Sequence, residues 1–255
     1  MSKLIKMELY KLRTSKLFII LLIIFAVLNA VIIAGTSIVM KAIPDAPVMS
    51  MALSDAFVSP FNAGILMMFM FISAVSFLYL DFSDGYIKNI AGQLPNRGGI
   101  VTAKYVAVTV HNLIFFLAGV LSSLIGGALS GLVIDTENLG AAVATFCIKW
   151  LLAMGISALL MFFAVGLRSK IFGVILAVMI PLSALSLLYM GINALVSNFL
   201  KVEGFSLNDY MPDALLGSVN AVENSLVANG IIAAIVCIVL FYILTYITFK
   251  KKDIK

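Results

Sequence analysis

Long apolar runs alternate with short polar stretches along the whole chain. Six of these runs reach the length of about 20 residues that a helix needs to cross about 30 Å of hydrocarbon. We therefore predict an all-α, polytopic membrane protein in which residues 1–255 form one transmembrane domain. The predicted spans are Leu17–Met40, Phe61–Leu80, Val101–Val133, Leu139–Leu167, Ile171–Ala194 and Val227–Phe249.

The charges between these runs predict the orientation of the chain. Of the 17 basic residues, 14 lie in stretches that the alternating spans place on one side of the membrane, and most acidic residues lie on the other. Basic residues near span ends stay in the cytoplasm, so both termini are predicted to be cytoplasmic and the number of spans to be even. The 14 residues are Lys3, Lys6, Lys11, Arg13, Lys16, Lys88, Arg97, Lys104, Arg168, Lys170, Lys250, Lys251, Lys252 and Lys255.

The composition excludes several classes of protein. Hydrophobic residues make up 63% of the chain and charged residues only 11%, whereas a soluble domain carries about 25% charged residues. The net charge of +5 is explained by membrane orientation, and no nucleic-acid partner is expected. Cys147 and Cys237 stand alone in apolar runs, so neither a disulfide nor a metal site is predicted. The first run is too long for a cleaved signal peptide and is predicted to be retained.

Residues 1–16 place apolar residues at helical spacing among basic ones. The apolar positions are Met1, Leu4, Ile5, Leu9 and Leu12. This pattern is typical of a helix that lies along an anionic membrane surface, and we predict an interfacial elbow helix here. The alternative is an ordinary positively charged start to the first span.

Two stretches on the acidic side are predicted to be external. Residues 41–60 contain three prolines and are expected to form a loop. Residues 191–226 are moderately amphipathic and carry most of the outer acids, and Pro212 is placed to open a short helix. This external segment is predicted either to cap the outer end of the helices or to dip back into the outer leaflet.

Groups suited to catalysis are nearly missing. His111 is the single histidine, which excludes an HExxH zinc helix, and neither GxSxG nor a phosphate-binding GxxxxGK[ST] occurs. We therefore predict a protein that is not an enzyme and binds no cofactor or metal itself. An intramembrane enzyme would need paired carboxylates or a Ser–His pair at membrane depth. A stand-alone secondary transporter or channel would show inverted repeats or broken helices lined with acids.

Two polar groups lie inside the predicted spans. Lys149 lies about ten residues into the fourth span, where an unpaired ammonium costs several kcal/mol. Its stem either extends toward the external interface or lines a cavity on a translocation pathway. His111, with Asn112, is expected to be hydrogen-bonded by neighbouring helices, although His111 also remains a candidate for the pathway.

Small residues recur at every fourth position of the third span, at Gly119, Ser123, Gly127 and Gly131. Small residues on one face let helix backbones approach closely. This face is predicted to pack within one bundle, with a dimer interface as the alternative. The fifth span has a shorter series, Gly173 and Ala177, followed by a predicted kink at Pro181.

The cytoplasmic stretch 82–100, between the second and third spans, is the most informative segment. Gly85 permits a sharp break after the span. Ile87, Ile90 and Leu94 then form one apolar stripe at helical spacing, and Pro95 ends the short helix. Such a helix fits a groove on a cytoplasmic partner, and a helix lying on the membrane surface fits the same pattern.

This stretch resembles the membrane subunits of type-2 ABC exporters, especially the six-span permeases of the bacitracin-resistance, lantibiotic-immunity and peptide-toxin-export group. Those proteins carry an acidic-x-x-x-Gly-Thr-aliphatic-Lys-Asn segment, then an arginine, then a lysine at the next span. The chain departs from this pattern at Tyr86, where threonine is usual. The matching residues are Asp81, Gly85, Ile87, Lys88, Asn89, Arg97 and Lys104.

The resemblance implies a permease of the bacterial plasma membrane that pairs with a second copy or a related permease. Two copies of a separate cytoplasmic ATPase, which bind ATP and Mg²⁺, would receive its coupling segment. The expected cargo is an amphipathic, antimicrobial or toxin peptide, with a lipid, ion or other lipophilic cargo as the alternative. The residues implied in coupling are Asp81, Asp84, Gly85, Ile87, Lys88, Asn89, Ile90, Leu94, Arg97 and Lys104.

Overall fold

Long apolar helices form the body of the protein in a computed structural model, which describes residues 2–41, 50–62, 64–83, 85, 98–131, 133–135, 138–200, 206–221 and 226–251. Within these ranges, five helices are long and apolar enough to cross a bilayer. They are α2 (Lys16–Lys41), α4 (Gly64–Ser83), α6 (Gly98–Leu129), α7 (Leu139–Met161), which continues as the π-helical turn η2 (Phe162–Gly166), and α11 (Val227–Lys251). The prediction of a helical, multi-pass membrane protein is confirmed.

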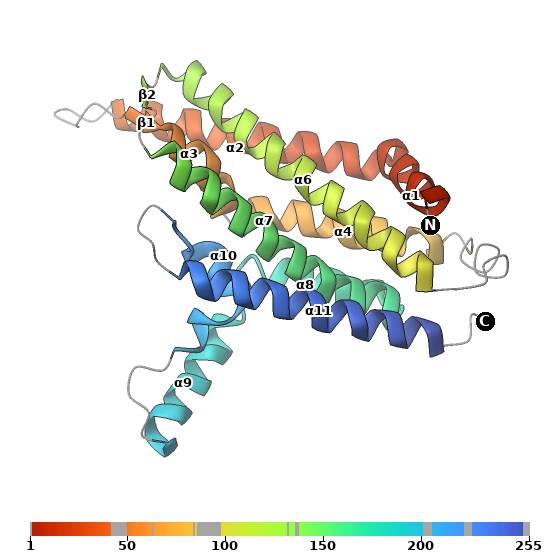
Figure 1. Cartoon of the computed structure of the whole chain (residues 1–255). Helices are drawn as coiled ribbons and strands as arrows, with labels where there is room; N and C mark the ends of the chain where they lie inside the picture. The colour runs from red at the N-terminus through yellow and green to blue at the C-terminus, as the bar shows by residue number, and fades with distance from the viewer. Residues whose placement is uncertain are drawn as a thin grey trace.

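The five helices run roughly along one common direction, with α2 packed along α6 and α11 packed along α7 (Figure 1). In the most apolar stretch of α7, 67% of the residues are buried, whereas the share is only 17% in each of α2 and α11. The core is therefore built from α4, α6 and α7. The exposed faces of α2 and α11 carry isoleucine, valine and leucine, as a lipid-facing surface requires.

The predicted fifth span, Ile171–Ala194, is wrong in its continuity. The structure instead has α8 (Lys170–Met179), a turn, and α9 (Ser186–Leu200). At 1.5 Å per residue, α8 is only about 15 Å long. Helix α8 ends two residues before Pro181, which lacks the N–H that a continuing helix would donate. Ser183 then adopts a left-handed φ of 53°. Figure 1 shows α9 leaving the bundle at a steep angle.

The end of the bundle opposite α1 is covered by short elements. Strands β1 (Ser50–Ala52) and β2 (Val133–Asp135) pair in parallel, and α3 (Leu53–Val58) and η1 (Ser59–Phe61) follow β1. The other elements here are η3 (Leu207–Asp209) and α10 (Pro212–Ser218), which packs on α7. Helix α10 begins at Pro212, as predicted.

The other end of the bundle brings together the two ends of the chain. Helix α1 (Ser2–Thr14) packs against α6, and the last turns of α11 lie at the same end (Figure 1). Helix α4 ends here and α6 begins here. Gly85 follows α4 with a φ of +66°, a conformation that glycine adopts without strain.

Candidate functional site: a buried ionic network

Three helices together place four charged side chains at the α1 end of the bundle. Glu8 lies four residues after Leu4 and four before Leu12, so it shares the apolar face of α1 and points into the protein. Lys11 follows one turn later, on the same side of α1. Asp81 lies in the last turn of α4, and Lys104 lies near the start of α6.

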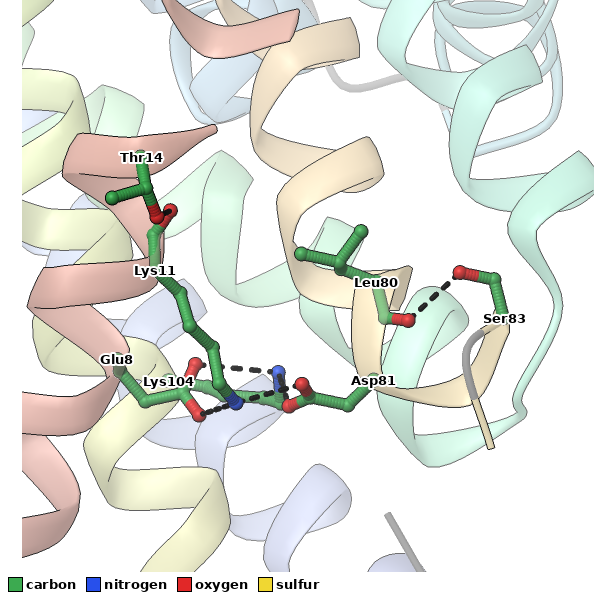
Figure 2. A network of polar contacts seen from close by, with 7 residues as sticks. All are labelled: Glu8, Lys11, Thr14, Leu80, Asp81, Ser83 and Lys104. Atoms are coloured by element: carbon green, nitrogen blue, oxygen red, sulfur yellow. Dashed lines mark hydrogen bonds and ion pairs between the residues drawn. The ribbon is translucent and has the colours of Figure 1, made fainter. Parts of the chain in front are cut away.

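These four side chains form a closed ring of ion pairs (Figure 2). Lys11 Nζ lies 2.9 Å from Glu8 Oε1 and 2.7 Å from Asp81 Oδ1. Lys104 Nζ lies 2.6 Å from Asp81 Oδ2 and 3.4 Å from Glu8 Oε2. Each cation thus contacts both carboxylates, and the ring carries no net charge. The Lys104 ammonium also lies 5.8 Å from the centre of the Phe77 ring, a distance at which the ring face attracts a cation.

The ring is shielded from solvent. Glu8 is 1% exposed, Asp81 3% and Lys104 0%. Burial by itself lowers the pKa of the Lys11 ammonium, but the hydrogen bond to Asp81 and the charge of Glu8 outweigh it and raise that pKa above its ordinary value of 10.5. Buried charges of this kind are stable only when every member is paired. The network therefore behaves as one unit.

The network stands at both roots of the predicted coupling segment. Asp81 lies two residues before α4 ends at Ser83, and Lys104 lies six residues after α6 begins at Gly98. Two predicted coupling residues are thus paired with each other and with α1. The others, Asp84, Ile87, Lys88, Asn89, Ile90, Leu94 and Arg97, lie outside the described residues, whereas Gly85 is described and exposed.

Lys149 lies toward the opposite end of the bundle, in α7, and is fully buried. Its ammonium donates to the side-chain oxygen of Asn62 and, at 2.7 Å, to the carbonyl oxygen of Leu216. Both acceptors are neutral. Lys149 thus connects α7 to α10 and to the turn before α4, and it does not line the apolar cavity beside α11.

His111 lies in a buried polar cluster between α4, α6 and α7. Asn112 Nδ2 donates to Ser157 Oγ at 2.8 Å. Asn112 Oδ1 therefore accepts a hydrogen bond from His111 Nδ1–H, at 3.1 Å. His111 Nε2 then accepts from the Ser73 hydroxyl at 2.9 Å. Both ring nitrogens are used by neighbouring groups, as expected for a histidine that joins helices.

The small-residue face of α6 packs against other parts of the same chain. Asn29 of α2 donates to Gly119 O at 3.1 Å and to Ser123 Oγ at 2.9 Å. Gly127 is buried, and Gly131 lies beyond the end of α6 with a φ of +65°. The residue in closest contact with the α2 backbone is Gly126, beside Ala30, which the four-residue spacing did not single out.

Two functional candidates were missed from the sequence. Glu8 was not singled out, although an acid on the apolar stripe of α1 signals a buried partner. Asn29 is the one strongly polar side chain within the first apolar run, Leu17–Met40, and such residues connect helices in membranes. No three His, Cys, Asp or Glu side chains among the described residues lie close enough together to hold a metal ion.

Comparison with known protein families gives one match. Residues 4–184 match the family model described as ABC-2 family transporter protein. The match includes α1, the network and both roots of the 84–97 segment, and it ends beside the turn after α8. A search of curated proteins finds no match.

Proposed function

The chain belongs to the ABC-2 transporter family, and from this premise we propose that it is the permease subunit of an ATP-driven exporter of amphipathic or antimicrobial peptides. Membrane subunits of this family normally work with an ABC ATPase and are generally not catalytic themselves. In this proposal two permeases, either two copies of this chain or one copy and a related subunit, assemble with two ATPase subunits. ATP and Mg²⁺ bind on the ATPase.

The charge distribution supports a cytoplasmic location for the α1 end. The described basic residues at this end include Lys3, Lys6, Arg13, Lys16, Lys170, Lys250 and Lys251, whereas Asp209 and Asp213 lie at the other. Lysine and arginine near span ends favour the cytoplasmic side. Since α8 is only about 15 Å long, the return of the chain toward the other end is made by α8 together with the turn that follows it, where Pro181 lies beside Gly64.

The observation that carries the proposal is the position of the ionic network. A permease must transmit the movement of its ATPase from a cytoplasmic segment to its spans. Asp81 and Lys104 stand at the two roots of the 84–97 segment, and both pair with Glu8 of α1 or its neighbour Lys11. Because one missing partner leaves a buried charge unpaired, the two roots and α1 are expected to move together.

The mechanism follows from this rigid connection. Closure of the two ATPase subunits on ATP would displace the 84–97 segment, and the network would carry that displacement into α1, α4 and α6. Since α6 packs along α2, the lipid-facing helix would move with it. The space between two permeases would then change shape and release the cargo outward.

An amphipathic cargo suits the surfaces that the structure provides. The described parts of the spans are apolar. Their one acidic side chain, Asp81, is ion-paired within the network at the α1 end. A relay of carboxylates, as a proton or metal-ion pathway would use, is therefore not offered by these helices. A cargo with an apolar face can travel along the lipid-exposed sides of α2 and α11.

The coupling role can be tested by co-purification from native membranes. Ile87→Glu with Ile90→Glu places carboxylates on the predicted docking stripe, and we expect an ABC ATPase to be lost from the tagged chain. The matched control is Ser218→Glu, which adds a carboxylate at an exposed site of α10 at the other end and is expected to retain the ATPase. Retention by both variants, or ATPase activity of the purified chain alone, would contradict the proposal.

A further inference from the structure

An apolar cavity of about 320 Å³ lies between α7 and α11, beside the turn that ends α8. The break after α8 helps to shape this space, because residues of the turn and Tyr189 of α9 line it. Its walls come from two spans and from the turn. They include Ile156, Leu159, Leu185, Ala233, Val236 and Cys237.

One rim of the cavity is acidic. Asp213, in the first turn of α10, lines it together with Tyr189 of α9. The Tyr189 hydroxyl lies 2.9 Å from Asp213 Oδ1 and 3.0 Å from Oδ2, and it donates to the carboxylate. In the part of the chain that the structure describes, no lysine or arginine lies within ion-pair distance of Asp213. Among the described residues, the carboxylate thus has the Tyr189 hydroxyl and the backbone N–H groups of Asp213 and Ala214 as partners, and no cation.

The geometry points to a binding site for a single-chain cationic amphiphile, with its hydrocarbon chain between α7 and α11 and its ammonium or guanidinium group on Asp213. This inference deepens the proposed function, since it assigns a chemical class of cargo and a place where it binds. A chain in the cavity would contact apolar side chains of α7, α11 and the turn after α8. The cation would supply a charged partner that no described residue gives to the half-buried carboxylate.

The volume selects one chain rather than two. An apolar cavity of about 150 Å³ holds a benzene ring of six carbons, so 320 Å³ has room for about a dozen carbons. The two long chains of a membrane phospholipid do not fit. Val236 and Leu240 line the cavity and are also 57% and 50% exposed, so the cavity opens on the lipid-facing side of α11. An amphiphile can therefore enter from the outer leaflet.

The site can be tested by photolabelling the full chain in nanodiscs, without ATP or any partner. The probe is dodecylamine carrying a diazirine on its chain, and the comparison probe has a hydroxyl in place of the amine. We expect labels on Leu159, Val236 and Leu240, competed by unlabelled dodecylamine. A hydrogen bond to a charged group is worth about 1.5–3 kcal/mol, so the amine should label about tenfold more strongly than the alcohol.

Two variants separate the roles of the chain and the head group. Ala233→Trp fills the cavity and is expected to lower labelling by about tenfold, whereas its neighbour Ile232→Trp, at an exposed site outside the cavity, is expected to leave labelling unchanged. Asp213→Asn keeps the shape of the rim and is expected to abolish the preference for the amine while chain labelling persists. Monodisperse elution of each variant shows that it is folded.

Three results would overturn the inference. They are equal labelling by amine and alcohol in the unmodified chain, labels that persist in Ala233→Trp, and stronger competition by phosphatidylethanolamine than by dodecylamine, which would assign the cavity to a bilayer lipid. The test is independent of transport. Labelling without any associated ATPase would retain this site and reject the proposed function, whereas ATPase association without selective labelling would do the reverse.

Discussion

The two ends of the bundle treat buried charge in different ways. At the α1 end, Glu8, Lys11, Asp81 and Lys104 pair completely, and each cation contacts both carboxylates. At the α10 end, the partners of Lys149 among the described residues are neutral oxygens. Asp213 there lies at the rim of a cavity with a hydroxyl for a partner. At the α1 end the four charged groups pair with one another, whereas at the α10 end the described partners of Lys149 and Asp213 are neutral groups.

This difference matches the tasks proposed for the two ends. A part that transmits force must move as a unit, and a ring of buried ion pairs resists separation because any single break leaves a charge unpaired. A part that binds and releases a ligand must tolerate rearrangement, and a hydrogen bond between a charged group and a neutral one leaves no second charge unpaired when it breaks. The following predictions test whether the two ends differ in this way.

The largest effect is expected from Lys104→Met. This variant leaves Glu8 and Asp81 to share Lys11, so one buried negative charge has no partner, and loss of about 3–5 kcal/mol of stability is expected. The measurement is thermal unfolding of the purified chain. Lys170→Met, which removes an exposed lysine from the start of α8, is the control and should change little. The double variant Glu8→Gln, Lys104→Met leaves a neutral Lys11–Asp81 pair and should recover part of the loss; no recovery would contradict a coupled ring.

A smaller loss is expected from Lys149→Met. This change removes a donor from Asn62 and from the Leu216 carbonyl, and it leaves no charge unpaired. Unsatisfied neutral acceptors cost about 1–3 kcal/mol. Faster amide hydrogen exchange in residues 212–218 would report the loosened attachment of α10 to α7, with Lys250→Met as an exposed control. A loss as large as that of Lys104→Met would remove the distinction between the two ends.

The smallest effects are expected from pH, and they fall at opposite extremes. Burial raises the pKa of the Asp213 carboxyl above its ordinary value of 3.8, so the folded chain holds that proton more tightly than the unfolded chain. Stability from Asp213 is therefore present at low pH and decreases as the pH rises from 3.8 through the raised pKa. The pKa of Lys11 is raised above 10.5, so its contribution is complete below pH 10.5 and is lost above it.

Melting temperatures across the pH range test both signs. Asp213→Asn should remove the decrease in melting temperature as the pH rises above 3.8 and leave the alkaline limb unchanged, and Lys11→Met should flatten the alkaline limb. The result against the account is a decrease of equal slope above pH 3.8 in the unmodified chain and in Asp213→Asn.

Much of the fold could be predicted from the sequence because lipid imposes a simple requirement on length and polarity. The spans that became α2, α4, α6, α7 and α11 were found to within a few residues. The fifth span failed because hydropathy does not distinguish a continuous helix from two helices joined by a turn. Pro181 marked the position, and the turn there packs closely on Gly64, where a side chain would collide with the Pro181 carbonyl.

The candidate site was predictable only in part. Asp81 and Lys104 stood out through the resemblance of the stretch around residues 82–100 to type-2 ABC permeases, yet that resemblance does not show that they pair with each other. Their pairing with Glu8 and Lys11 depends on how α1 folds back onto α6, which is a tertiary contact. The cavity beside α11 is shaped in part by the broken fifth span, so the error in the span also hid the cavity.

The most direct test of the account replaces the whole network with apolar groups of similar size: Glu8→Met, Lys11→Met, Asp81→Leu and Lys104→Met together. Exchange of a complete buried ion network for apolar groups is often tolerated by the fold, so the variant can be assembled with its ATPase in liposomes. The measurement is the amount of a cationic amphipathic peptide exported per ATP hydrolysed. The account predicts continued hydrolysis with export reduced at least several-fold, because the segment is no longer tied to α1, α4 and α6. An unchanged export ratio would contradict it.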